Sequence, residues 1–166
     1  MKIAFSGSHG TGKTTSCYEL AYKYQVNGHT CGILPEVARK CPLAINQNTT
    51  YEAQLWIFSK QIEEEIKLSR RYGTLICDRT LIDTIAYTRF ICGDLWKEMF
   101  NISKYMMPTY DKIYFKKVDN NENFFKEDGV RDMDPVFRKT IDSYINEMYD
   151  ELIIDNIILP SIIEYQ

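Results

Sequence analysis

A glycine-rich segment near the N-terminus constrains the fold more than any other feature of the sequence. Residues 7–14 read Gly-Ser-His-Gly-Thr-Gly-Lys-Thr, which matches the pattern GxxxxGK(S/T) in full. An apolar run at residues 2–6 precedes the segment, and helical spacing of Cys17, Leu20 and Ala21 follows it. A strand, a glycine-rich loop and a helix in this order predict a phosphate-binding loop at the end of a buried strand.

The residue types of this loop explain how it can hold phosphate groups. Glycines let the backbone turn tightly, so successive N–H groups point inward, and the N-terminus of the following helix adds partial positive charge. We therefore expect the loop to bind the β- and γ-phosphates of ATP. The residues predicted to hold the nucleotide are Gly7, Ser8, His9, Gly10, Thr11, Gly12, Lys13, Thr14 and Thr15.

Individual side chains of the loop have separate predicted roles. Lys13 reaches the β- and γ-phosphates as a point charge, and the Thr14 hydroxyl completes the coordination of Mg²⁺. Thr15 is expected to donate to the α-phosphate. His9 occupies a variable position, where an exposed side chain is favoured over a contact with nucleotide. A glycine-rich turn that precedes a helix by chance is the alternative, and Lys13 and Thr14 argue against it.

Composition limits the class of protein. A length of 166 residues allows one domain, and a formal charge of -3 with pI near 5.5 offers no broad basic surface for a nucleic-acid backbone. The five cysteines form no CxxC pair and only two histidines could join them, so free thiols are preferred to disulfides or a zinc site. Neither a signal peptide nor a membrane-spanning run is recognisable, and we expect a cytoplasmic protein.

Apolar periodicity and turn residues divide the chain into alternating strands and helices. Strands are predicted at residues 2–6, 30–34, 74–77, 112–117 and 157–159. Helices are predicted from residue 13 to a stop at residues 27–28, and at residues 51–71, 81–91, 94–106 and 135–152. The polar segment 119–134 predicts a loop. This alternation predicts an α/β fold around a mainly parallel five-stranded sheet, within a single domain of residues 1–166.

Two predicted strands end in charged residues. The carboxyl ends of parallel strands surround the ligand crevice of an open α/β sheet. Glu36 follows the second strand and Asp78-Arg79 follows the third, so we expect them beside the phosphate loop. Asp78 could bind Mg²⁺ through water or orient an acceptor. Glu36 could face the crevice or pair with Arg39 at the surface.

With these residues the sequence resembles the P-loop nucleoside and nucleoside monophosphate kinases, which include deoxynucleoside kinases, thymidylate kinases and nicotinamide riboside kinase-like domains. The resemblance covers most of the chain and implies a three-layer P-loop NTPase fold with a mobile lid at about residues 119–138. Deoxynucleoside kinases carry a glutamate after the second strand as the base for the acceptor hydroxyl, and Glu36 is similar to it. Their Glu-Arg-Ser after the third strand, or the Asp-Arg of thymidylate kinases, corresponds to Asp78-Arg79-Thr80 here.

The resemblance implies further site residues. Gln54 would read the base from the long helix, although a surface glutamine is equally compatible with its position. Arg131 and Arg138 would lie in the lid over the transferring phosphate, and Arg39 would hold an acceptor phosphate together with Arg79. One departure affects substrate identity: this chain has Pro-Glu-Val-Ala-Arg at residues 35–39, where thymidylate kinases have Arg-Glu-Pro and deoxynucleoside kinases Glu-Pro.

Together these features predict an ATP- and Mg²⁺-dependent phosphotransferase that acts on a small (deoxy)nucleoside monophosphate or nucleoside. Lys13, Glu36, Asp78, Arg79, Arg131 and Arg138 are the predicted catalytic residues. Two alternatives remain: a kinase for a nucleic-acid end or a modified base in DNA, and an ATPase switch. The acidic composition argues against the first without excluding it. An apolar face within residues 81–106 could form a homodimer interface, although burial in the core is favoured.

Overall fold

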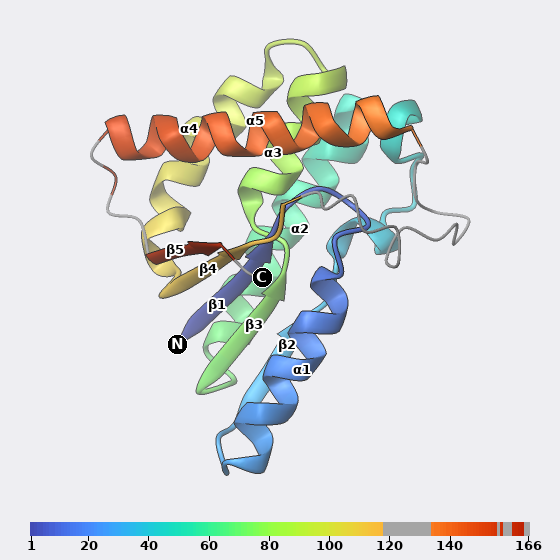
Figure 1. The fold of residues 1–166 in the computed structure, drawn as a ribbon. Helices are drawn as coiled ribbons and strands as arrows, with labels where there is room; N and C mark the ends of the chain where they lie inside the picture. The colour runs from blue at the N-terminus through green and yellow to red at the C-terminus, as the bar shows by residue number, and fades with distance from the viewer. Residues whose placement is uncertain (118–133, 156, 158–160, 165–166) are drawn as a thin grey trace.

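A parallel sheet with helices on both faces forms the centre of the computed structural model, which describes residues 1–117, 134–155, 157 and 161–164 (Figure 1). The strands are β1 (Lys2–Ser6), β2 (Cys31–Leu34), β3 (Thr74–Asp78), β4 (Lys112–Phe115) and β5 (Ser161–Glu164). The α-helices are α1 (Lys13–Val26), α2 (Tyr51–Ser69), α3 (Leu81–Ile91), α4 (Leu95–Met106) and α5 (Pro135–Ile154). Short 3-10 helices occupy Val37–Lys40, Asn46–Asn48 and Met107–Thr109.

The sheet has the strand order β2-β3-β1-β4-β5, and every pairing in it is parallel. The five-stranded parallel sheet is therefore confirmed. β1 lies between β3 and β4. The chain therefore first forms the strands on one side of β1, β2 and β3, and later forms β4 and β5 on the other side. The loop after β1 occupies this switch point, where the strand ends open into a crevice.

Alternating side chains along the central strands create two apolar cores. Phe5 and Ile76 pack with Cys17 and Ala21 of α1 on one face of the sheet. Ala4 and the residues beside Ile76 in β3 point to the opposite face, where α2 to α5 cover a larger core. The three layers visible in Figure 1 follow from this period of two, because successive side chains of a strand face opposite sides.

The last strand lies later in the chain than the sequence pattern predicted. The described strand β5 begins at Ser161, which pairs with Lys112, and residues 158–159 of the strand predicted at 157–159 lie outside the described residues. The N–H of Ile157 instead donates to the carbonyl of Leu152 at 3.1 Å and closes the end of α5. Apolar residues flank Pro160 on both sides, so hydrophobicity alone did not fix which run enters the sheet.

Most of the predicted lid lies outside the described residues, which omit 118–133. Its last part forms the start of α5, as the sequence predicted: Asp134 caps the helix by accepting the Val136 N–H at 2.8 Å, and Pro135 is the first helical residue. Within the range 81–106 considered as a possible interface, the residues of α3 from Leu81 to Thr88 are buried, whereas Ile102 and Tyr105 of α4 are exposed.

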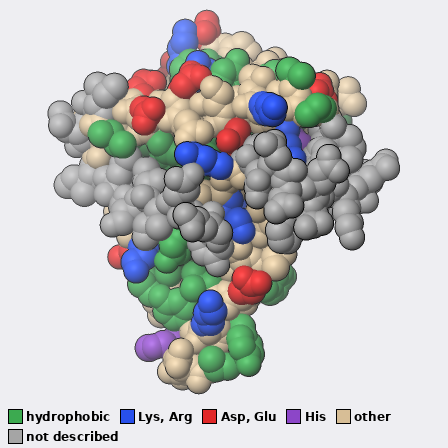
Figure 2. Space-filling model, viewed as in Figure 1, with side chains coloured by type: hydrophobic (Ala, Val, Ile, Leu, Met, Phe, Trp, Pro, Cys, Tyr) green, Lys and Arg blue, Asp and Glu red, His purple; other side chains and the backbone are tan. Residues whose placement is uncertain are grey.

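Figure 2 shows lysine and arginine side chains interspersed with acidic and apolar ones over the described part of this face. Within the described ranges, none of the helices is long and apolar enough to cross a membrane.

Candidate active site

The loop between β1 and α1 has the backbone expected of a phosphate cradle. Gly7, Gly10 and Gly12 have φ values of 136°, 72° and 76°. A Cβ atom on Gly7 would lie 2.3 Å from the carbonyl oxygen of Lys116, so a side chain has no room there. No side chain caps the N-terminus of α1, which leaves its first N–H groups available to an anion.

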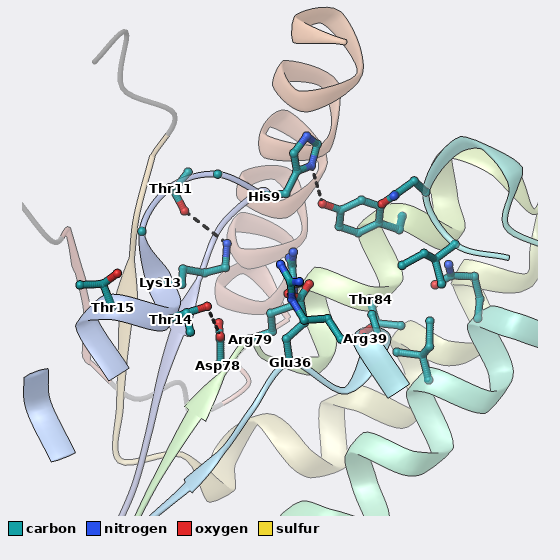
Figure 3. A pocket seen from close by; sticks show the side chains of 18 residues that line it. His9, Thr11, Lys13, Thr14, Thr15, Glu36, Arg39, Asp78, Arg79 and Thr84 are labelled. Carbon is teal, nitrogen blue, oxygen red and sulfur yellow. Dashed lines mark hydrogen bonds and ion pairs between the residues drawn. The ribbon is translucent and has the colours of Figure 1, made fainter. Parts of the chain in front are cut away.

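Lys13 lies buried in the centre of this loop. Its Nζ donates to the carbonyl of Ser8 and, at 3.2 Å, to the hydroxyl of Thr11 (Figure 3). The Ser8 Oγ is buried and has no hydrogen-bond partner among the described residues. Burial, and secondly the charge of Arg79, lower the pKa of Lys13 to about 8. An anion in the loop would stabilise the charged form of Lys13 and so oppose both effects on its pKa. The loop therefore fits the phosphates of a nucleotide.

Thr14 and Asp78 face each other across the first turn of α1. The Thr14 hydroxyl donates to Oδ2 of Asp78 at 2.5 Å. Burial raises the pKa of Asp78, and the nearby Lys13 charge opposes this effect. Hydroxyl and carboxylate oxygens suit Mg²⁺, which typically binds one or two protein groups together with substrate phosphates. The pair predicted from sequence as the metal site is therefore assembled. Thr15 lines the same cavity from an exposed position.

Charged residues that follow β2 and β3 in the chain form another wall of the cavity. Glu36 accepts from the Nε of Arg79 at 2.7 Å through Oε1 and from the Nε of Arg39 at 3.0 Å through Oε2. The pair with Arg39 was one of the two alternatives, but Glu36 shares its carboxylate with the buried Arg79 as well. Burial would raise the pKa of Glu36, yet the Arg79 and Lys13 charges outweigh it and lower that pKa to about 2.

Gln54 also lines this cavity. Its side chain is buried, so the surface position considered from sequence is wrong. Nε2 donates to the Thr49 hydroxyl at 2.9 Å, and Oε1 accepts from the Thr88 hydroxyl at 3.3 Å. These bonds fix the orientation of the amide, which lines the cavity beside Ile57 and Thr84.

His9 differs from the expectation of an exposed side chain, since it is only 5% exposed. The loop turns it toward α3 and α5. Its Nδ1 lies 2.9 Å from the hydroxyl of Tyr87, and its ring centroid lies 5.9 Å from that of Phe137. The expectation failed because the sequence pattern treats this loop position as variable, whereas two aromatic rings bury the side chain in the folded protein.

The structure describes one of the two predicted lid arginines. Arg131 lies outside the described residues. Arg138 is buried in the first turn of α5 and is not among the described residues that line the cavity.

The sequence patterns did not identify one carboxylate that accepts a hydrogen bond from the backbone of the phosphate loop. Asp83 is fully buried; its Oδ1 accepts the Gly7 N–H at 2.7 Å, while Oδ2 accepts the Thr80 N–H at 2.7 Å and the Thr80 hydroxyl at 2.8 Å. Thr80 and Asp83 form a capping box at the start of α3. The Thr-x-x-Asp spacing was the signal that could have identified it. Tyr87, one turn later, also lines the cavity.

The phosphate loop and the Glu36–Arg79 pair line one cavity of about 260 Å³. Figure 3 shows Lys13, Thr14 and Asp78 on one side of it, with Glu36, Arg39 and Arg79 beside them and Thr84 farther along. Cationic and carboxylate groups thus lie around a space that also offers apolar and hydrogen-bonding side chains. Such a lining suits a polar ligand that carries phosphate groups.

The lowered pKa of Glu36 gives a test by pH. In the unfolded chain this carboxyl titrates near its ordinary value of 4.5, and in the folded protein near 2. The ion pair therefore stabilises the fold fully above about pH 5, and this contribution falls as pH drops toward 2. We expect Glu36→Gln to lower the free energy of unfolding in urea at pH 6, and the difference from wild type to shrink at pH 3. A difference that is constant between these pH values would contradict the assignment.

Comparisons with solved structures show that the chain shares the fold of P-loop nucleoside and nucleotide kinases, as the sequence resemblance predicted. Thymidylate kinase from Ehrlichia chaffeensis is 20% identical, with a TM-score of 0.63 over 98% of this chain and 91% of that chain. Deoxyadenosine kinase from M. mycoides with bound dATP is 17% identical, with a TM-score of 0.66 over 99% and 90%. Thymidylate kinase from Candida albicans is 17% identical, with a TM-score of 0.64 over 98% and 82%.

Sequence comparison gives the family directly. No curated protein matches the sequence of this chain. The sequence model of one family, described as AAA domain, matches residues 2–164, which is nearly the whole chain. The chain therefore belongs to the AAA domain family.

Proposed function

We propose that the protein transfers the γ-phosphoryl group of ATP, with Mg²⁺, to a small (deoxy)nucleoside monophosphate or nucleoside. The observation that carries this proposal is the shared cavity, in which Lys13 and the Thr14–Asp78 pair lie beside the Glu36–Arg79 pair. An enzyme that only hydrolyses ATP needs a site for a water molecule. The second set of charged side chains in this cavity instead suits a second substrate. The fold shared with nucleoside and nucleotide kinases supports the same conclusion.

Catalysis in this proposal comes from positioning and charge neutralisation. Lys13 would bind the β- and γ-phosphates once they replace its contacts to Ser8 and Thr11. Thr14 and Asp78 would hold Mg²⁺, which supplies positive charge to the phosphate oxygens. Arg79 donates to the carbonyl of Gly7 at 3.2 Å, so it lies next to the loop that would hold the transferring group.

The acceptor side favours a molecule that already carries a phosphate. Both oxygens of Glu36 are engaged by arginines, and a carboxylate with a pKa of about 2 is a weak proton acceptor. A phosphate oxygen needs no base to attack, and Arg79 and Arg39 could bind its charge. A nucleoside monophosphate is therefore preferred to a nucleoside. Gln54 would contact the base, and Arg131 would act from the lid.

The direct test is acceptor-dependent formation of ADP. Purified protein with ATP and Mg²⁺ is assayed with nucleoside monophosphates, nucleosides and a short oligonucleotide. We expect one nucleoside monophosphate to stimulate ADP release strongly. Asp78→Asn should then lower turnover by about a hundredfold while changing ATP affinity only a few-fold, because it removes charge from the metal site.

Asp94→Asn is the matched control, since Asp94 is exposed and pairs only with Lys97 in a described ion pair at 2.7 Å. It should leave turnover unchanged. Stimulation by the oligonucleotide alone would identify a nucleic-acid kinase instead. If no acceptor of any class raises ADP release above the basal rate, the proposed transfer reaction is wrong.

The pKa of Lys13 predicts how nucleotide affinity depends on pH. In the free protein this pKa is about 8, and ATP binding favours the charged ammonium. Affinity should be level below pH 8 and fall by up to about tenfold per pH unit above it, because binding must then take up a proton. Titration with a fluorescent ATP analogue at pH 7 to 10 measures this. Lys13→Met should bind weakly without this dependence; an equally level wild-type curve would refute the role of Lys13.

A further inference from the structure

Arg79 has a strained backbone at the most crowded point of the site. Its φ is 96°, in a region that non-glycine residues rarely adopt. A strained residue of this kind persists only where its surroundings fix it from several sides, and such residues cluster at functional sites. The contacts that hold Arg79 in this conformation therefore bear on the function of the site.

Hydrogen bonds from both the amide and the side chain hold Arg79 in place. Its N–H donates to the carbonyl of Phe5 at 3.0 Å. Its Nε and Nη1 donate to Glu36 and to the carbonyl of Gly7. The carbonyl of Arg79 has a different partner, the Nε2 of Gln61 at 3.3 Å. Gln61 thus holds the backbone of Arg79 through its carbonyl, while the other contacts hold its amide and side chain.

Gln61 is itself held by a buried ion pair. Its Nε2 also donates to Oε1 of Glu65 at 2.9 Å, and this carboxylate oxygen accepts the Tyr110 hydroxyl at 2.5 Å. Oε2 of Glu65 pairs with the Nζ of Lys2 at 2.8 Å. Because a carboxylate can only accept, it selects the NH₂ end of the Gln61 amide. The same NH₂ group is thereby turned toward the Arg79 carbonyl.

We propose that Gln61 is a positioning residue, which acts through Arg79 to place its guanidinium for the acceptor phosphate. This inference rests on the proposed function. Gln61 is 1% exposed, lies two turns after Gln54 on α2, and is not among the described residues that line the cavity. It therefore does not touch the substrate. The helix that presents Gln54 to the cavity also reaches the back of Arg79 through Gln61.

Gln61→Met tests the inference, because methionine has a similar shape but no donor. We expect kcat/KM for the acceptor to fall by roughly tenfold, mainly through a higher acceptor KM, with ATP affinity unchanged. Tyr110→Phe is the matched control: it removes one hydrogen bond from the same buried network but leaves the contact between Gln61 and Arg79 intact. It should lower the melting temperature without changing the acceptor KM.

Equal kinetic effects of the two variants would overturn the inference, since they would indicate general destabilisation of the network. A crystal structure of Gln61→Met provides a readout that does not depend on activity. We expect Arg79 to leave its positive φ and its Nε to move away from Glu36; unchanged geometry would overturn the inference even if the wild-type protein is an active kinase. If wild type shows no acceptor activity, the proposed function fails, and this structure still decides whether Gln61 positions Arg79.

Discussion

The guanidinium of Arg79 joins the parts of the site that the sheet brings together. It binds the Glu36 carboxylate after β2 and the carbonyl of Gly7 in the phosphate loop, while its own backbone continues from β3. The centroid of the Tyr87 ring lies 5.4 Å from the guanidinium carbon, which stands over the face of the ring. A planar cation with several donors can make these contacts at once, which an ammonium group could not. The geometry of both walls of the cavity therefore depends on this side chain.

Buried charges of both signs surround Arg79, and their arrangement shapes the chemistry of the site. Lys13 and Arg79 face Glu36, Asp78 and Asp83, all within one crevice. Each carboxylate has a structural partner: Glu36 binds arginine, Asp78 binds Thr14, and Asp83 binds the backbone of Gly7. Nucleotide phosphates would compete for the cations and change this arrangement. Closely packed groups of opposite charge thus preorganise a site for anionic ligands before any ligand arrives.

The sequence predicted those parts of the site that depend on local patterns. The loop from Gly7 to Thr14 and the strand-end residues Glu36, Asp78 and Arg79 could be placed because spacing and parallel topology determine them. Long-range packing determined the rest. The burial of His9 depends on Tyr87 and Phe137, which are far from it in sequence, and the hold of Asp83 on Gly7 spans 76 positions. β5 begins at Ser161, and apolar character alone did not distinguish this run from the apolar residues before Pro160.

The central claim is that two anionic molecules occupy one cavity side by side. Calorimetric titration of nucleoside monophosphates into protein saturated with Mg²⁺ and an unhydrolysable ATP analogue measures this directly. We expect at least one monophosphate to bind at a ratio of one per chain while the analogue stays bound. If every monophosphate either fails to bind or displaces the analogue, the cavity holds only one ligand and the proposed transfer between two bound ligands is wrong.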